Sequence, residues 1–340
     1  MERVALSVDD VRELTRAALA RHGCDDENAA AVAEVVTAAE RDGCPSHGLF
    51  RVPGYVAALK SGKVNGKAQP SVDRLAAGVL KVDGHGGFAP LALRCGRAPL
   101  VDLARAQGIA AEVLTDIYHF AALWTELEPI AEQGIAVFAF TSYLPSVAPA
   151  GAKRAFFGTN PMAFGWPRGS HPPMVFDQAS AAMARGEIQI AARDGHPVRA
   201  GAGIDADGNP TTDPASILGG AQLPFGGYKG SAIALMVELL AGGLIGEAFA
   251  FEAAQQDNKD GGPPRGGELL IALDPMHFGD RERWHAHSER FFTELCGLDG
   301  VRLPADRRHA NRQSSLSGGV QVPAPLVDEV RGLAGLPPRA

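Results

Sequence analysis

The chain has 340 residues, of which 46% are hydrophobic and 21% are charged, a composition typical of a soluble globular protein with one large or two smaller domains. The formal charge of −7 provides no basic field, which excludes nucleic acid as an expected partner, and no apolar run is long enough to cross a membrane. The four cysteines are far apart and form no C-x-x-C pair, so neither structural metal nor a disulfide framework is expected, and a reducing, cytoplasmic location is indicated.

The chain is predicted to begin with two helices. Ser7–Asp10 has the pattern of a helix start, and a second helix is predicted over 26–42, ending at Gly43. The next stretch, Cys44–Arg51, therefore follows directly from a helix C-terminus. A loop that is anchored in this way often carries functional residues.

Ser46, His47 and Arg51 combine the groups that proton transfer and carboxylate binding require. Imidazole can give or take a proton near neutrality because its ordinary pKa is about 6.5, a neighbouring hydroxyl can orient it, and a guanidinium offers a two-pronged grip for a carboxylate. In a helix His47 and Arg51 would share one face, although Pro53 interrupts such a helix. The alternative on these residues alone is a capped turn with solvent-facing side chains.

A strand is predicted over 78–83, followed by Gly84–Ala89, which matches G-x-G-x-x-A. The regular strand-helix repeats that a Rossmann crossover unit requires do not continue beyond this point. We therefore interpret Gly84–Ala89 as a structural turn and not as a dinucleotide fingerprint.

From residue 108 onward strand and helix signals alternate, which predicts a mixed α/β core. Strands are predicted over 108–114 and 135–141, and the intervening helix is predicted to run from Tyr118 to near Gly134. A strand over 175–180 ends in polar residues, where the sites of α/β proteins usually gather.

Three later stretches offer groups that bind anions, each with a plainer alternative. The turn Phe157–Gly165 supplies backbone N–H groups or is a surface turn, and Phe225–Gly230 places a lysine at a helix N-terminus. Arg302–Arg308 is either a phosphate clamp or a solvated basic patch. A mobile loop is predicted over 254–267, and the tail beyond Gln313 is predicted to be extended until a helix near 326–333.

Six motifs occur together in one order: SHGLFRVPGY, HFAALW, FGTNPMAFGWP, DQAS, PTTDP and PFGGYKG. With these motifs the chain, from about Ser7 to the tail, resembles the malate/L-lactate dehydrogenases of the second, non-Rossmann type. HFAALW, ARGE and RLPADRR are most similar to the branch that reduces Δ1-piperideine-2-carboxylate and Δ1-pyrroline-2-carboxylate.

The resemblance implies an α/β fold with a mixed sheet, a non-Rossmann NAD(P)-binding topology and a helical N-terminal region. It divides the chain into an N-terminal helical and substrate region (1–118), an NAD(P)-binding α/β domain (119–290) and a C-terminal segment that returns to the first region (291–340). It also implies a homodimer that acts on a small molecule.

The resemblance assigns roles to residues by position. His47 becomes the proton donor, with Ser46 and the carboxylate of Glu187 as its relay, and Arg51 and Thr159 become contacts to the substrate carboxylate. The implied cofactor contacts are His119, Phe120, Ala121, Ala122, Leu123, Asp177, Gln178, Ala179, Lys229, Gly230, Arg302, Arg307 and Arg308.

These roles predict hydride transfer from NAD(P)H to the carbon of a cyclic C=N bond, with the proton supplied by His47. We expect NADPH to be preferred, because the arginines of 302–308 suit a phosphate better than a hydroxyl. Between Ser46 and Gly62 the only cations are Arg51 and Lys60, and Lys60 lies too far along the chain to bind the second carboxylate of a dicarboxylate. Five apolar residues near the motifs are predicted to form a wall against the substrate ring, although at least two of them are expected to lie in the core instead. They are Phe50, Tyr55, Phe156, Phe157 and Met162.

Two other functions stay open at this point. A dehydrogenase of open-chain 2-hydroxy acids, such as malate or lactate, would use the same residues. A non-catalytic binding protein on the same scaffold is disfavoured, because Ser46, His47, Arg51 and Lys229 are all retained.

Overall fold

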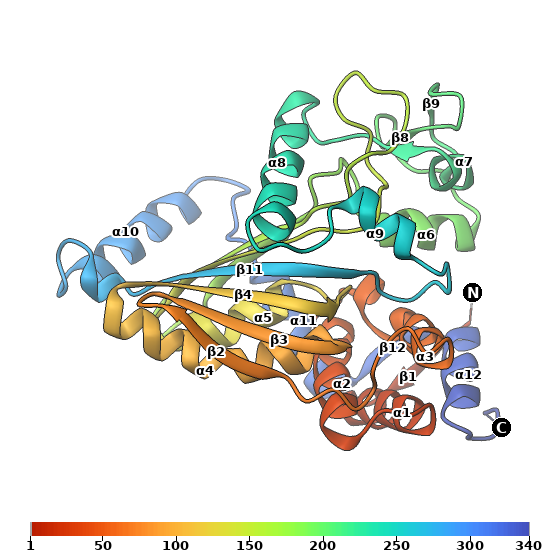
Figure 1. Ribbon diagram of the computed structural model, residues 1–340, viewed down its shortest axis with the longest axis horizontal. Coiled ribbons are helices and arrows are strands. Elements are labelled where there is room, and N and C mark those ends of the chain that lie inside the picture. Colours follow the sequence, from red (N-terminus) through yellow and green to blue (C-terminus); the bar gives the residue numbers. More distant parts are fainter. Residues whose placement is uncertain (1, 340) are drawn as a thin grey trace.

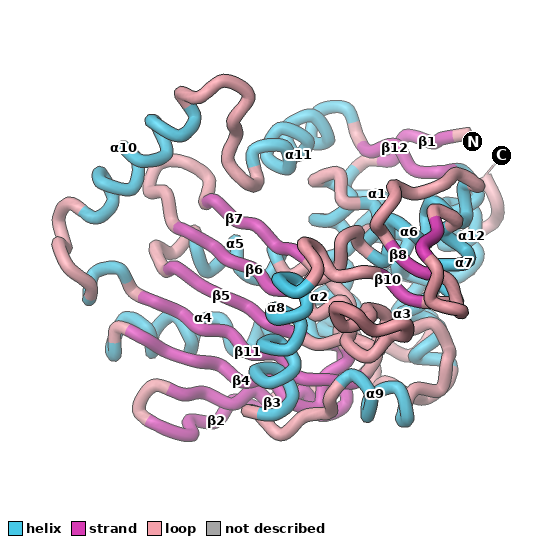
Figure 2. Tube along the Cα trace, turned by 90° about the horizontal axis from the view of Figure 1, so that it is seen from above, coloured by secondary structure: helices cyan, strands magenta, loops and turns pink. Residues whose placement is uncertain are grey.

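The fold is built on a seven-stranded mixed sheet, seen in a computed structural model that describes residues 2–339. The strand order is β2-β3-β4-β11-β5-β6-β7, and only the neighbours β3 and β4 are parallel (Figure 2). This confirms the predicted mixed α/β fold. The strands are β2 (Ser71–Ala76), β3 (Val79–Phe88), β4 (Ile109–Tyr118), β11 (Arg265–Leu273), β5 (Ala136–Thr141), β6 (Met162–Trp166) and β7 (Met174–Gln178).

Helices cover both faces of the sheet, because alternate residues of the central strands are apolar on each face. Leu114 of β4 packs on the face covered by α4 (Ala89–Gln107) and α5 (Trp124–Ala131). Its neighbour Val113 packs on the opposite face, under α8 (Tyr228–Glu238) and the π-helical turn η3 (Leu239–Gly243). Figure 1 shows α4 below the sheet and α8 above it.

The N-terminal helices form a second layer with its own core, beside one end of the sheet (Figure 1). Strand β1 pairs antiparallel with β12, so the two ends of the chain lie together. Ser7 caps the first helix in a reciprocal capping box with Asp10, as its sequence pattern predicts. The elements are β1 (Arg3–Leu6), α1 (Val8–Arg21), α2 (Asp26–Arg41), α3 (Val52–Lys60), β12 (Val320–Pro323) and α12 (Ala324–Leu333).

A third, smaller unit carries the segment after β7. Ile188 and Ala191 of α6 pack against Ile217 of α7, and a short sheet in the order β10-β8-β9 lies beside them. None of the helices between residues 2 and 339 is both long and apolar enough to cross a bilayer. The remaining elements are α6 (Arg185–Asp194), β8 (Gly203–Ile204), β9 (Pro210–Thr211), α7 (Pro214–Gly219), β10 (Ala221–Gln222), α9 (Ala250–Gln256), α10 (Trp284–Cys296) and α11 (Asp306–Gly318).

Two predicted boundaries in the sheet are wrong. The helix expected to start at Tyr118 starts at Trp124, because Tyr118 is still held in the sheet, paired with both Phe88 and Arg265. The turn expected at Gly84–Ala89 lies mostly within β3. A Cβ on Gly84 would lie only 2.9 Å from the carbonyl oxygen of Asp116, so this glycine permits close approach of two strands and not of a phosphate.

Two predicted loops are also more ordered than expected. The segment 254–267 is tied to the turn after α3 by Lys63, which pairs with Asp257 and Asp260 at 3.3 Å and 2.6 Å. The tail beyond Gln313 continues α11 as far as Gly318 before it becomes extended. In both cases the stabilising partner lies far away in the sequence.

Candidate active site

The stretch Cys44–Arg51 folds as two short 3₁₀ turns after the end of α2. Gly43 adopts φ +76°, which turns the chain out of the helix, and Gly48 has an extended ψ of −142° between the turns η1 (Pro45–His47) and η2 (Leu49–Arg51). The continuous helix in which His47 and Arg51 would share one face is therefore not formed.

Glu40 of α2 anchors these turns from behind. Its carboxylate accepts a hydrogen bond of 2.9 Å from the backbone N–H of Leu49, and a Cβ on Gly48 would collide with it. Burial raises the pKa of Glu40 to about 7, against the opposing effect of that hydrogen bond. Sequence reasoning missed this residue, because an acid inside a helix gives no sign of what its carboxylate will contact.

Ser46 and His47 form a hydrogen-bonded pair at the edge of a cavity. The Ser46 hydroxyl lies 3.1 Å from Nδ1 of His47, which leaves Nε2 as the ring nitrogen available to a ligand. Loss of hydration lowers the pKa of His47 to about 3, and the nearby Arg51 charge and then His119 act in the same direction. Without a bound anion, this imidazole is neutral at pH 7.

Arg51 is a guanidinium without a carboxylate partner among residues 2–339. Its Nη1 donates a weak hydrogen bond of 3.5 Å to the side-chain oxygen of Gln189, and its Nε is buried without a partner. The planar group lies 5.4 Å from the ring centre of Phe50 and 5.2 Å from that of Phe120. A buried and unneutralised cation of this kind favours a bound anion.

Arg185 brings a second guanidinium into the same cavity from the start of α6. Burial lowers its pKa, and its charge contributes to lowering the pKa of Arg51. Between them Gly186 packs against the turn, since a Cβ there would lie 2.8 Å from Cβ of Ser46 and 3.1 Å from Nη2 of Arg51. The ARGE motif directed attention to Glu187, whereas its arginine and glycine make the contacts to this site.

The cavity has a volume of about 840 Å³ and gathers most of the predicted site residues. Glu187 also lies on its wall, with an exposed side chain and no hydrogen bond to Ser46 or His47. The predicted residues that line the cavity are Ser46, His47, Arg51, His119, Phe120, Ala121, Ala122, Leu123, Thr159, Asp177, Gln178, Ala179, Glu187 and Arg307.

Four predicted cofactor contacts lie outside the cavity wall: Lys229, Gly230, Arg302 and Arg308. Arg308 is buried, donates a hydrogen bond of 2.6 Å to the carbonyl of Val175 and lies 4.1 Å from the ring centre of Trp124. Of the three arginines that were expected to act together, only Arg307 lines the cavity.

The predicted apolar wall is wrong. None of its five residues lines the cavity: Tyr55 packs in the N-terminal core, Met162 lies on the α8 face of the sheet, and Phe156 is half exposed elsewhere. The apolar lining comes instead from residues of several loops and of α6 that sequence spacing does not bring together, with the predicted cofactor residue Phe120 beside them. They are Leu123, Met183, Ile190, Val198 and Phe225.

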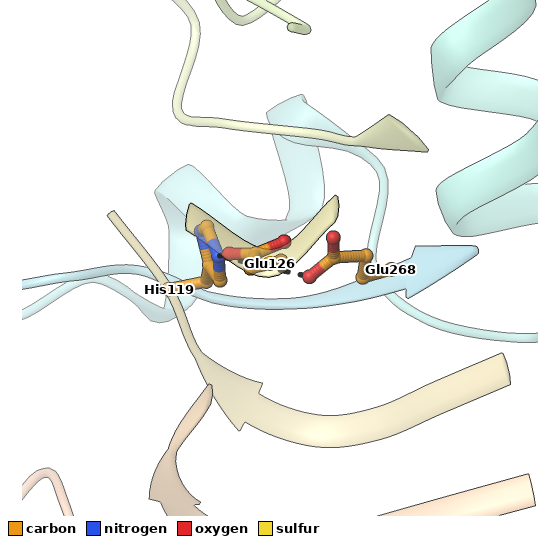
Figure 3. Close-up of side chains that lie close together, drawn as sticks. All are labelled: His119, Glu126 and Glu268. Carbon is orange, nitrogen blue, oxygen red and sulfur yellow. Dashed lines mark hydrogen bonds and ion pairs between the residues drawn. The ribbon is translucent and has the colours of Figure 1, made fainter. Parts of the chain in front are cut away.

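His119 forms part of the opposite wall and is held from behind by acids (Figure 3). Its Nε2 lies 2.6 Å from Oε1 of Glu126 and 3.6 Å from Oε2 of Glu268, and all three side chains are buried. The site thus places two histidines on one cavity, one beside cations and one beside carboxyl groups.

Comparison with known proteins assigns this architecture to a family. A profile described as malate/L-lactate dehydrogenase matches residues 6–331, so the chain belongs to the malate/L-lactate dehydrogenase family of oxidoreductases. This confirms the family predicted from the six motifs.

Within this family, the chain is similar in sequence and structure to reductases of cyclic imino acids. The chain is 46% identical to a Δ1-pyrroline-2-carboxylate reductase of Ancylobacter novellus over 98% of each chain. It is also 46% identical to a Δ1-pyrroline-2-carboxylate/Δ1-piperideine-2-carboxylate reductase of Pseudomonas aeruginosa, over 97% of this chain and 99% of the relative. The crystal structure of Δ1-piperideine-2-carboxylate reductase from Pseudomonas syringae superimposes with a TM-score of 0.91 at 43% identity, covering 97% of this chain and 99% of that one.

Proposed function

We propose that this protein reduces a cyclic 2-imino acid, Δ1-pyrroline-2-carboxylate or Δ1-piperideine-2-carboxylate, to L-proline or L-pipecolate with NADPH. The observation that carries the proposal is the pairing of a serine-bound imidazole with an unneutralised guanidinium, Arg51, on one cavity. Its support from comparison is the 46% identity to reductases of these imino acids over nearly the whole chain.

The cavity residues fit a nicotinamide cofactor. The volume of the cavity, about 840 Å³, is near the upper end of the range for small-molecule sites, about 300–1,000 Å³. An elongated cofactor and a small acid together require a cavity of this size. Along the wall formed by His119–Trp124, the indole N–H of Trp124 is buried without a partner. We propose that this wall, with Asp177–Ala179 and Arg307, holds the cofactor, which supplies hydride to the C=N carbon when bound.

The chain's own residues then orient the acid and manage its proton. Arg51 binds the substrate carboxylate, assisted by Thr159, and so fixes the C=N bond relative to His47. The carboxylate also neutralises the Arg51 charge, which after burial is the second cause of the low pKa of His47, so bound substrate raises that pKa. His47 then gives its Nε2 proton to the imine nitrogen, while Ser46 holds the ring by Nδ1. Glu187, which is exposed on the same wall and makes no hydrogen bond to either residue, is proposed to act only in proton exchange with solvent.

A dehydrogenase of open-chain dicarboxylates is the second candidate, and Arg185 favours it. Lys60, the only other cation within 46–62, does not line the cavity, whereas α6 brings Arg185 into it from far along the chain. If Arg185 binds a second carboxylate, Arg185→Gln will reduce activity on oxaloacetate far more than activity on the imino acid.

The direct test follows NADPH consumption by purified protein with Δ1-piperideine-2-carboxylate, and identifies the product by chiral chromatography. We expect L-pipecolate in proportion to the NADPH oxidised. Absence of turnover on both cyclic imino acids, with NADPH and with NADH, would contradict the proposal.

We further propose that the protein is a cytoplasmic homodimer. Large apolar side chains are exposed along α8 and the segments beside it, and burying them would favour association. They are Tyr228, Leu235, Leu239, Leu244, Phe251 and Phe156. Light scattering measures the mass directly, and Leu235→Glu should shift it to that of a monomer.

A further inference from the structure

The wall behind His119 contains more carboxyl groups than cations. Glu126 enters it from α5, Glu268 from β11 and Glu112 from β4, each buried on the sheet face that α4 and α5 cover. Among residues 2–339, both oxygens of Glu112, both of Glu268 and one of Glu126 make no hydrogen bond. A dry carboxylate without a partner is costly, so such groups retain protons.

The backbone directs one of these acids towards His119. The pairing of β11 with β4 shifts its register between Gly266 and Glu268, and Glu268 lies opposite Thr141 of β5. Register shifts of this kind re-aim side chains beside active sites. The result is that Glu268 reaches to 3.6 Å from the same ring nitrogen that Glu126 contacts at 2.6 Å (Figure 3).

The protonation of this pair determines which hydrogen-bonding group His119 presents to the cavity. A neutral Glu126 donates its O–H to Nε2, so the ring proton resides on Nδ1. An ionised Glu126 accepts from Nε2–H and leaves Nδ1 as a bare acceptor. Nδ1 has no partner within residues 2–339, so it is the atom left for a ligand.

Building on the proposed function, we propose that Glu126 and Glu268 are positioning residues that hold a proton and keep His119 in the Nδ1–H tautomer, as a hydrogen-bond donor to the cofactor. The ligand group is then an acceptor oxygen, as in the carboxamide of a nicotinamide. Neither acid touches substrate or cofactor, and both act through the ring of His119.

The charges around the pair favour its protonated form on balance. Burial raises the pKa of Glu126 to about 8, and the pKa of Glu268 is raised as well, by burial and by Glu126. Contact with the Glu268 carboxyl group and the charge of Arg97 from α4 stabilise an ionised Glu126, whereas Asp177 from β7 and Glu112 from β4 repel it. His119 itself stays neutral, because burial lowers its pKa.

The test measures NADPH affinity of the full-length protein from about pH 7, where the 2′-phosphate is already ionised, to about pH 9.5. In the wild type the affinity should fall about tenfold as Glu126 ionises and the donor at Nδ1 is lost. Glu126→Gln can donate from its amide at every pH, so its affinity should stay nearly constant. Glu112→Gln is the matched control, since this acid is equally buried but does not contact His119, and it should retain the fall.

The proposal is overturned if Glu126→Gln shows the wild-type fall, or if Glu112→Gln removes the fall to the same extent. Nitrogen-15 NMR of histidine-labelled wild-type protein gives a second readout that needs no variant to fold. A proton on Nδ1 of His119 near pH 7 supports the proposal, and a proton on Nε2 or a divalent ion at that nitrogen overturns it. Absence of NADPH binding at every pH would overturn the proposed function, while the NMR result would still decide the tautomer.

Discussion

Two histidines face one cavity from regions of opposite charge. His47 lies beside Arg51, with Arg185 close to that guanidinium, and no carboxylate within ion-pair distance of either arginine among residues 2–339. His119 lies against Glu126 and Glu268, with Arg97 as the cation that attracts Glu126. Both imidazoles are neutral in the free protein, but for different reasons: burial is reinforced by cations at His47 and opposed by an acid at His119.

The difference shows that the location of an unpaired ionisable group indicates how the group is neutralised. A guanidinium that lacks a carboxylate but lines an open cavity can be neutralised by a ligand, so Arg51 indicates an anionic substrate. A carboxyl group that lacks a cation and is buried against the sheet cannot be neutralised by a ligand, so it retains its proton. Bound substrate therefore raises the pKa of one histidine, and the other is kept in one tautomer beforehand.

The largest expected effect follows from removing the first histidine. His47→Ala should lower turnover by about 10²–10⁴-fold, the usual contribution of a catalytic acid, and leave NADPH affinity unchanged. In the wild type the rate of reduction should fall as pH rises, and the fall in kcat should come at higher pH than the fall in kcat/KM, because bound substrate offsets the Arg51 charge. A variant that retains half of the wild-type rate would remove His47 from the mechanism.

The second-largest effect is expected from removing Arg51, the cation beside His47. Arg51→Gln should raise KM for the imino acid about 100-fold, because a charge-assisted pair with the carboxylate is lost. It should also move the pH profile of kcat/KM upwards, since a cation that lowers the pKa of His47 is gone. Steady-state kinetics across pH measures both, and an unchanged pH profile would show that Arg51 acts on the substrate alone.

The motifs pointed to residues that the structure brings together in this region, because its members are close in sequence. Ser46 and His47 are adjacent, and their hydrogen bond needs only a short turn. Arg185 and Glu40 were missed because the tertiary fold, and not local spacing, brings them to the turn. The predicted apolar wall failed for the same reason: residues near a motif in sequence point to either face of an element, and Met162 points to the far face of the sheet.

The basic cluster near the C-terminus provides the third test. Arg307→Ala alone should raise KM for NADPH about tenfold and leave KM for NADH nearly unchanged, because a lone exposed cation contacts only the extra phosphate. Arg308→Ala is the contrast, since its guanidinium bonds the Val175 carbonyl and packs on Trp124. It should lower thermal stability and affect both cofactors alike. Equal efficiency with NADPH and NADH in the wild type would contradict the expected preference.

The smallest expected effect belongs to the buried acids. Burial raises the pKa of Glu112 to about 8 in the folded chain, above its value near 4.5 in the unfolded chain. Between these values the folded state binds a proton that the unfolded state releases, so the free energy of unfolding should fall by about 1.4 kcal/mol for each unit by which pH rises. Glu112→Gln should reduce this slope, which urea unfolding across pH measures. Equal slopes in the two proteins would mean that Glu112 is already ionised when folded.

The cluster of buried carboxyl groups behind His119 could not be predicted from the sequence, for a physical reason. Glu112, Glu126 and Glu268 are scattered over three elements, and a single acid in a strand or helix is usually solvated. Only the sheet order, which places β11 between β4 and β5, brings them together behind His119. The resemblance predicts a cofactor contact for His119, but the acids that hold its ring could be found only in the structure.

The most direct test of the whole account is an internal competition. Wild-type protein with NADPH receives Δ1-piperideine-2-carboxylate and oxaloacetate at equal concentration, and the ratio of products gives the ratio of kcat/KM. We expect L-pipecolate to form in large excess, because Arg51 binds one carboxylate and a protonated C=N accepts hydride more readily than a ketone. Malate in excess would contradict the imino-acid assignment and would identify Arg185 as the binding residue for a second carboxylate.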